Sequence, residues 1–389
     1  MNIAAFIDSL QEAVAESVIT STCQARFIRF RQQEHFLKFM ELWSEQRQLP
    51  NEHVHIKPLS SIHSLACFLS DYTSLALFSP FITLETDNPV TIDANAVRSA
   101  APSATTRSNE KAFSWGIKHV KAPQAWKKTI GQQIKIGVVD TGVDFNHPDL
   151  RHTLIHGVNL VYPLRPPVDD NGHGTHIAGI IAASNKYHGM TGVAPGALIA
   201  PVKAFDEFGS AFVSDIILAI EWCVQNRMDI INMSFGMKKR NKALLDAVTA
   251  AYQSGIIIVA SSGNDGKRST IDYPARYTQT IAVGATSKLR KVAPFSNRSN
   301  SIDIFAPGDK ITSLWPQNSY HEMSGTSMAT SHVSGAIALL LALYPNLSPS
   351  QIKTIVKRSI QPLKNYKTQR AIGELDITRM LQIARSSHK

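Results

Sequence analysis

The chain has 389 residues, of which 43% are hydrophobic and 18% charged, and its formal net charge is +10. This balance predicts a globular protein, long enough for one large domain and a smaller one. The Lys and Arg residues are scattered, and no RNA-binding signature occurs. We therefore interpret the positive charge as solvated surface, and the sequence argues against a nucleic-acid partner.

The start of the chain and its cysteines bear on its location. The first residues lack the basic region of a signal peptide, and acidic residues interrupt their apolar run. The most apolar stretch, Val333–Leu343, is too short to span a membrane. Cys23, Cys67 and Cys223 are odd in number and widely separated, which suits neither a disulfide framework nor a metal site. We therefore expect a cytoplasmic protein without a membrane partner, with non-classical export as the alternative.

Residues 1–108 are predicted to be a small α+β domain that ends in a linker. Its apolar spacing predicts strands at 25–30, 54–59 and 81–85 and helices at 33–47 and 61–71. From Ala94 to Asn109 the composition shifts to Ala, Ser, Thr, Pro and Asn, which is typical of exposed linkers. The remaining residues, 109–389, are predicted to form the second domain.

Strands and helices alternate from Ser114 onward. The strands are predicted at 133–139, 198–204, 229–234, 256–260 and 280–285, and the helices at 173–184, 214–226 and 242–254. This alternation predicts an α/β fold, a doubly wound and mostly parallel sheet with helices on both faces. Ligands bind outside the carboxyl ends of such strands, and Asp140, Ser234 and the segment 261–264 fall at such ends.

Four polar residues at strand ends and helix starts could carry chemistry. Taken singly, Asp140 and Asn264 are ordinary turn residues, and His173 and Ser327 are ordinary helix-start residues. Together they are what acyl transfer needs: a nucleophile, a base, a carboxylate that orients the base and an amide donor for the oxyanion. His173 and His176 have the spacing of a metal pair, but no Cys or further His lies nearby, which argues against zinc.

Three segments around these residues resemble the active-site motifs of subtilisin-like serine proteases, the subtilases or peptidase family S8. The segments are Val139–Asp144, Asn171–Gly179 and Gly325–Thr330. The order Asp, His, Ser along the chain is the one known for subtilisins. The resemblance covers about residues 114 to 383, and three long motifs in the right order make it specific.

The resemblance implies a serine endopeptidase that acts on polypeptides through an acyl-enzyme and is made as a self-processed zymogen. Asp140, His173 and Ser327 would be the triad, Asn264 the oxyanion donor, and the N-terminal domain an inhibitory propeptide. The implied substrate-binding residues lie in three segments: Gly209, Ser210 and Ala211; Ser234, Phe235 and Gly236; and Ser261, Ser262 and Gly263. The alternative is a catalytically silent relative that works as a binding or signalling module.

Two positions depart from the family pattern. Ser331 stands where the family usually has Pro before the helix His, and this change is expected to let the nucleophile turn relax. Asp149 matches a calcium ligand of the family, but Lys186 falls where an oxygen ligand is expected. The sequence therefore predicts no required cofactor and argues against calcium, with Asp149 as the one candidate ligand.

Asp272 bears on substrate choice. By resemblance it lies at the base of the primary specificity pocket, where a carboxylate would favour Lys or Arg before the scissile bond. The alternative is a loop Asp that points into solvent. A preference for basic residues would also predict self-processing after Arg107 or, as second choice, after Lys111, both in the linker.

Overall fold

The computed structural model describes most of the chain as two compact units. The described residues are 1–17, 23–46, 56–69, 73–92, 114–184, 189–363 and 372–387. The first unit comprises Met1–Pro89 and Phe212–Glu221, and the second comprises Val90–Ala211 and Trp222–Lys389. The predicted domain boundary at residue 108 lies outside the described residues and stays a prediction. Within the described ranges, no helix is long and apolar enough to cross a membrane.

The first unit is a small α+β structure around a four-stranded antiparallel sheet with the strand order β2-β3-β1-β4. Its elements are α1 (Ile3–Ser17), β1 (Gln24–Phe30), α2 (Gln33–Gln46), β2 (Lys57–Leu59), η1 (Ser60–Ile62), β3 (Ser64–Leu69), η2 (Thr73–Phe78) and β4 (Ile82–Thr86). An aromatic cluster fills its core: Phe6 of α1 makes edge contacts with Phe30 of β1 and Phe39 of α2. All three rings are buried, which is worth about 2–3 kcal/mol each.

The helix predicted at 61–71 is wrong. That stretch holds η1 and the strand β3, which pairs with β2 on one side and β1 on the other. Five of the six residues of β3 are buried. A short apolar run fits a buried helix and a buried strand equally well, so its spacing could not decide between them.

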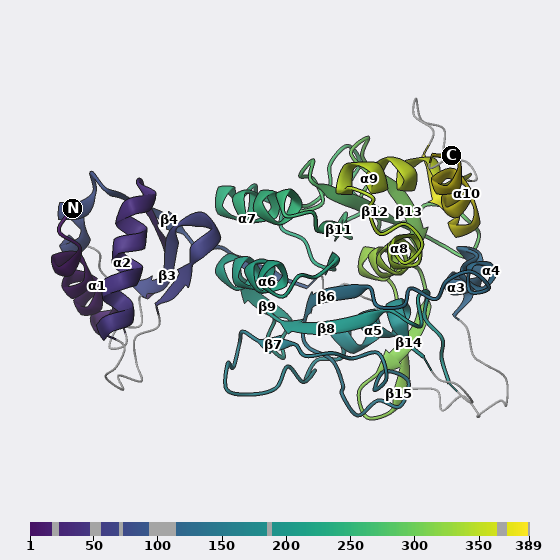
Figure 1. Ribbon diagram of the computed structural model, residues 1–389, viewed down its shortest axis with the longest axis horizontal. Coiled ribbons are helices and arrows are strands. Elements are labelled where there is room, and N and C mark those ends of the chain that lie inside the picture. Colours follow the sequence, from purple (N-terminus) through teal and green to yellow (C-terminus); the bar gives the residue numbers. More distant parts are fainter. Residues whose placement is uncertain are drawn as a thin grey trace. The chain divides into compact units, whose positions relative to one another are not determined.

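The second unit is built on a nine-stranded sheet with the order β16-β17-β13-β12-β11-β10-β6-β8-β7 (Figure 1). Its strands are β6 (Lys135–Asp140), β7 (Val158–Asn159), β8 (Leu198–Lys203), β10 (Ile230–Met233), β11 (Ile257–Ser261), β12 (Thr280–Thr286), β13 (Ile304–Pro307), β16 (Ile360–Pro362) and β17 (Gly373–Leu375). Every pair is parallel except β16 with β17. The predicted α/β class with a mostly parallel sheet is thereby confirmed.

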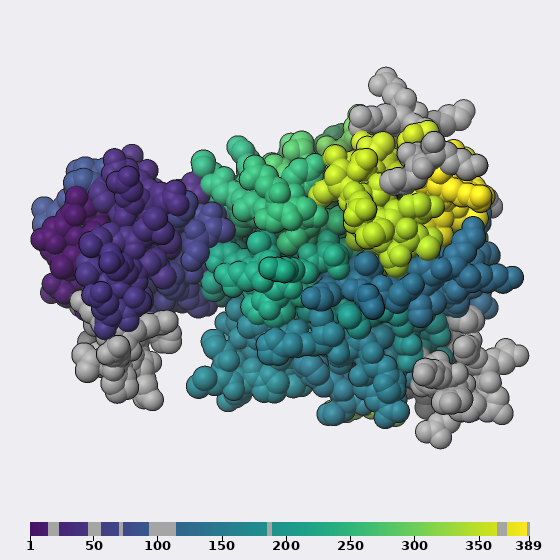
Figure 2. All heavy atoms as spheres, viewed as in Figure 1, coloured from purple at the N-terminus to yellow at the C-terminus, as the bar shows by residue number. Residues whose placement is uncertain are grey.

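Helices and two small sheets complete this unit. The helices are α3 (Trp115–His119), α4 (Ala122–Ala125), α5 (His173–Ala182), α7 (Lys242–Gln253), α8 (Thr326–Leu341), α9 (Pro349–Arg358) and α10 (Ile377–Ser387), while α6 (Val213–Gln225) begins in the first unit. The small sheets pair β5 (Pro89–Thr91) with β9 (Ser210–Phe212) and β14 (Ile311–Trp315) with β15 (Ser319–Met323). Helix α10 contacts α4 and α9, and together they form one region of the surface in Figure 2.

Helices α5 and α8 fix the position of the site. They pack against each other and against the sheet, and both are buried along their whole length. A helix that is apolar all round can be buried in this way. Because the sheet is parallel, β6, β10 and β11 end at one edge, and α5 and α8 begin close to these strand ends.

Candidate active site

Asp140 and His173 are in direct contact. Asp140 is the last residue of β6, His173 is the first of α5, and both are buried. The Nδ1 atom of His173 lies 2.8 Å from the Asp140 Oδ1 atom, which also accepts the backbone N–H of Thr141 at 2.8 Å. An Nδ1–H directed at a carboxylate leaves Nε2 unprotonated, so the imidazole is set up as a base.

Asp169, which sequence analysis missed, holds the start of α5 in place. Its Oδ1 atom accepts the backbone N–H of Gly172 at 2.8 Å and the hydroxyl of Thr141 at 2.8 Å. Its Oδ2 atom accepts both the backbone N–H and the hydroxyl of Thr175, at 2.8 and 2.6 Å. These bonds tie the first turn of α5 to the end of β6, and so they fix His173 against Asp140. The position of Asp169 in the sequence, shortly before His173, was the feature that could have identified it.

Gly172 is required where α5 begins. Its φ is 110°, a left-handed value that favours glycine, and a Cβ atom there would come within 2.3 Å of the Trp315 ring. Any side chain at this position would therefore displace the His173 turn.

Lys203, at the end of β8, is a second buried residue that sequence analysis missed. Its ammonium donates to the Thr141 carbonyl at 2.7 Å and to Asp170 Oδ1 at 2.6 Å, although the side chain is only 1% exposed. A buried ammonium is tolerated because both contacts are good acceptors. It holds the turn that follows Asp140 from the other side.

Ser327 lies in the first turn of α8 beside the end of β10. Its hydroxyl donates to the Ser234 carbonyl at 2.9 Å. Strands β10 and β6 are neighbours, with Met233 opposite Val139, so Ser234 and Asp140 follow the paired ends of adjacent strands. The sheet therefore brings Ser327 and the His173–Asp140 pair to the same edge, where the helix N-terminus favours developing negative charge.

Ser331 makes a hydrogen bond back to this turn. Helix α8 runs without interruption from Thr326 to Leu341, and the Ser331 hydroxyl donates to the Ser327 carbonyl at 3.0 Å. This is the bond that serine side chains make within helices, and the expected relaxation of the turn stays a prediction.

Asn264 is anchored to the same helix start. Its Oδ1 atom accepts the backbone N–H and the hydroxyl of Thr326, both at 2.9 Å. With the amide oxygen fixed in this way, the amide nitrogen points the other way, towards Gly325, where an added Cβ atom would lie 3.5 Å from it. The amide nitrogen therefore lies near the residue that precedes the first turn of α8.

An extended segment of the chain already lies along the predicted substrate-binding residues. Thr91 forms an antiparallel bridge with Gly236, and the Ile92 N–H donates to the Gly209 carbonyl at 2.9 Å. Strand β5 pairs with β9, which holds Ser210 and Ala211. Backbone pairing of this kind is how an extended peptide adds a strand to a sheet edge. The arrangement shows that the surface between Gly209 and Gly236 accepts an extended chain.

Asp272 does not point into solvent: it is 2% exposed. Its backbone N–H donates to the Ser262 carbonyl at 3.1 Å, and Ser261 donates its hydroxyl to the Phe235 carbonyl at 3.1 Å. The Asp272 Oδ2 atom accepts a hydrogen bond from the Lys238 ammonium at 2.7 Å. The Asp272 carboxylate therefore has a counter-ion within the chain, while its predicted place at the base of the specificity pocket stays a prediction. A Cβ atom at Gly263 would come within 2.2 Å of Asp272 Oδ2, so the carboxylate lies against that glycine.

Asp149 and His176 have structural partners. Asp149 Oδ2 accepts the Met190 N–H at 2.8 Å and the Tyr320 hydroxyl at 3.0 Å. His176 Nε2 lies 3.1 and 3.0 Å from two backbone carbonyls, so this nitrogen carries the proton. Burial lowers the pKa of His176 to about 3, which keeps the ring neutral. Lys186 lies outside the described residues, which contain no group of three or more His, Cys, Asp or Glu placed to hold a metal.

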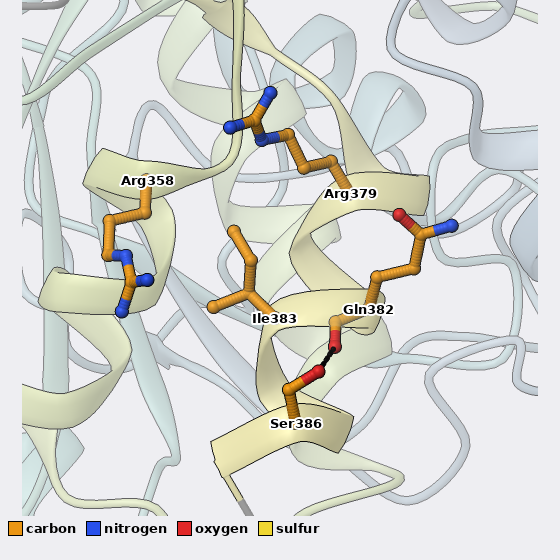
Figure 3. A pocket seen from close by; sticks show the side chains of 5 residues that line it. All are labelled: Arg358, Arg379, Gln382, Ile383 and Ser386. Carbon is orange, nitrogen blue, oxygen red and sulfur yellow. Dashed lines mark hydrogen bonds between the residues drawn. The ribbon is translucent and has the colours of Figure 1, made fainter.

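A pocket on another part of the second unit lies between α9 and α10 (Figure 3). It is lined by Arg358, Arg379, Gln382, Ile383 and Ser386. The Ser386 hydroxyl donates to the Gln382 carbonyl at 3.1 Å, as expected for a helix serine, and the lining includes no His, Asp or Glu. The pocket therefore offers no base for a serine nucleophile.

Comparisons with known proteins agree with this geometry. The profile of the subtilase family matches residues 131–374. The chain is 41% identical to subtilisin DY of Bacillus licheniformis over 243 residues. This alignment covers 61% of this chain and 88% of subtilisin DY. The chain is 39% identical to the minor extracellular protease Epr of Bacillus subtilis, over 66% of this chain and 40% of that one. It is 35% identical to an alkaline protease of Alkalihalobacillus alcalophilus, over 90% of both chains.

These comparisons overturn the expected cytoplasmic location. One relative is named as an extracellular protease, which conflicts with that expectation. The cysteines without disulfides do not indicate the cellular compartment, because Cys67 and Cys223 are buried. Burial raises the pKa of the Cys67 thiol to about 12 and raises that of Cys223 too, so neither forms a reactive thiolate readily. Buried thiols of this kind do not report the redox state of the compartment.

Proposed function

This chain belongs to the subtilase family and is a serine endopeptidase, and from that premise we propose that Asp140, His173 and Ser327 are its catalytic triad. The observation that carries the proposal is the 2.8 Å contact between His173 Nδ1 and the buried Asp140 carboxylate. This contact fixes the tautomer in which Nε2 can take a proton, and a carboxylate stabilises the imidazolium that forms.

In this mechanism His173 takes the proton of the Ser327 hydroxyl as the oxygen attacks the substrate carbonyl. The amide N–H groups of Asn264 stabilise the resulting oxyanion, together with the backbone N–H of Ser327 in the first turn of α8. His173 then gives its proton to the leaving amine, which leaves an acyl-enzyme on Ser327. A water molecule, activated by His173 in the same way, releases the acid product.

Polypeptide substrates would bind as an added strand between Gly209–Ala211 and Ser234–Gly236. The contacts of Thr91 with Gly236 and of Ile92 with Gly209 support this mode, since they place an extended chain there. We propose on the same ground that the N-terminal part of the chain is an intramolecular inhibitor, because a segment in this position blocks the substrate. Ser261–Gly263 would contact the substrate on the side of Asn264.

Self-processing would then free the cleft. The predicted cleavage sites after Arg107 and Lys111 lie outside the described residues and stay predictions. N-terminal sequencing of the processed protein decides between the two positions.

No cofactor is required in this mechanism, because each step uses the side chains of the chain itself. Calcium would at most stabilise the fold. Asp149 is the candidate ligand, and both of its neutral donors would have to rearrange to free Oδ2 for a cation.

The proposal is tested with a fluorophosphonate probe and the Ser327→Ala variant. We expect the probe to label Ser327 in the processed wild-type protein, and the variant to hydrolyse no peptide and to stay at full length. A wild-type protein that is folded and processed yet unlabelled would instead support the catalytically silent alternative. Efficient self-processing by Ser327→Ala would remove Ser327 from the mechanism.

A further inference from the structure

A buried carboxylate lies directly behind the two glycines that border the substrate groove. An added Cβ atom at Gly236 would come within 2.9 Å of Asp272 Cβ, and one at Gly263 within 2.2 Å of Asp272 Oδ2. Gly236 comes two residues after Ser234, whose carbonyl accepts the Ser327 hydroxyl. Gly263 comes directly before Asn264, whose amide oxygen accepts the Thr326 N–H. A substrate side chain that passes between the two glycine backbones would therefore meet the Asp272 carboxylate.

This carboxylate has a counter-ion that comes from the chain itself. The Lys238 ammonium lies 2.7 Å from Asp272 Oδ2 and also pairs with Asp265. The Asp272 side chain is 3% exposed, whereas that of Lys238 is 46% exposed. The pair thus joins a buried anion to a cation on a long stem that is about half exposed.

We propose that Lys238 is a specificity-determining residue, a tethered ammonium that competes with a basic substrate side chain for Asp272. The inference rests on the proposed function and deepens it by assigning the charge of the pocket that holds the residue before the scissile bond. Asp272 alone would select Lys or Arg strongly. With Lys238 in place the anion is already paired, so an apolar side chain meets no unpaired charge.

The second partner of Lys238 makes its displacement feasible. When a substrate Arg or Lys reaches Asp272, the Lys238 ammonium can turn away and keep Asp265 as its counter-ion. No buried charge is left unpaired in either state, which is the condition for exchanging one ion pair for another. The exchange would weaken the selection of basic side chains without abolishing it.

The test measures kcat/KM for peptides that differ only in Arg or Leu before the scissile bond, with active sites counted by fluorophosphonate titration. Lys238→Met should raise the Arg-to-Leu ratio about tenfold or more, because Asp272 is then exposed to the substrate without a competitor. Lys238→Arg should keep the wild-type ratio, since it restores a tethered cation. Adding Asp272→Asn to Lys238→Met should remove the gain, because the two residues act on one interaction.

Lys267→Met is the matched control. Lys267 pairs with Asp265 at 3.3 Å and makes no ion pair with Asp272 among the described residues, so its loss should leave the ratio unchanged. An active protein whose ratio is the same in the wild type and Lys238→Met would overturn this inference alone, and so would an equal change in Lys267→Met. A wild-type protein that hydrolyses neither peptide would overturn the proposed function, and this inference with it.

Discussion

Asp140, the last residue of β6, and Asp272, which hydrogen-bonds to the residue after β11, are buried carboxylates. Each has an ionisable partner within hydrogen-bond distance. Asp140 pairs with His173, whose side chain is 4% exposed and starts a helix that Asp169 holds in place. Asp272 pairs with Lys238, whose side chain is 46% exposed. The His173 side chain is buried, whereas the Lys238 side chain is exposed and shares its ammonium between Asp272 and Asp265.

This difference in exposure is the physical basis for the two roles that we propose, catalysis for the Asp140–His173 pair and substrate selection for the Asp272–Lys238 pair. A fixed partner suits catalysis, because a proton must move along one defined line in every cycle. A solvated partner suits selection, because it can give way to a substrate. Burial raises the pKa of Asp272, and Lys238 offsets part of that rise, so the charge of Asp272 depends on keeping a cation nearby.

The largest expected effect tests the fixed pair. Asp140→Asn should lower kcat by about 10⁴, because a neutral amide neither fixes the His173 tautomer nor stabilises the imidazolium. Steady-state kinetics on one peptide measures this change. Asp246→Asn is the control, since Asp246 pairs with Lys242 on the surface of α7 and should leave kcat unchanged. A loss below tenfold for Asp140→Asn would show that the pair is not part of the mechanism.

Asn264 allows a sharper test, because its amide oxygen anchors the side chain to Thr326 and its amide nitrogen is the proposed oxyanion donor. Asn264→Ala should lower kcat by about 10²–10³ with little change in KM, since the amide N–H groups act on the transition state. Thr326→Ala removes only one of the two hydrogen bonds to the Asn264 oxygen and should lower kcat less than tenfold. Equal losses in the two variants would assign Asn264 a purely structural role.

His332 is a buried ionisable group, and it links the stability of the fold to pH. The His332 ring is fully buried and donates from Nδ1 to the Met328 carbonyl at 2.8 Å, and burial lowers its pKa to about 4. Because the folded pKa lies below the unfolded value of about 6.5, stability is complete above that pH and falls towards pH 4, by up to about 1.4 kcal/mol per pH unit.

Urea unfolding between pH 7 and 4.5 measures this slope. His332→Gln should flatten it, and His152→Gln, at an exposed position, should not. An unchanged slope in His332→Gln would show that the ring takes no part in acid unfolding.

Asp149 gives the smallest expected effect. Its oxygen is bound by two neutral donors, so its pairing does not depend on a cation. We therefore expect a chelator to leave activity unchanged and to shift Tm by no more than a degree or so, which corresponds to about 0.3 kcal/mol or less. Thermal unfolding with and without chelator measures the shift. A large drop in Tm that calcium restores would show a metal site in this loop.

The positions of the proposed catalytic residues could be predicted from the sequence because they depend on local patterns. Asp140 after a buried strand, and His173 and Ser327 at helix starts, could be placed from apolar periodicity alone, and a parallel sheet then brings its strand ends together. The three motifs added the family. The same periodicity failed at 61–71, where strand pairing on both sides decided between helix and strand.

Residues that act through contacts distant in sequence could not be found in this way. Lys238 and Asp272 are 34 positions apart, and Lys203 and Asp170 are 33 apart, so no local pattern joins them. The sequence by itself determined the fold class, the family and the places of Asp140, His173 and Ser327 at a strand end and two helix starts, because these are local features. Only the tertiary structure decided which charges are paired, because an ion pair depends on where two distant segments meet.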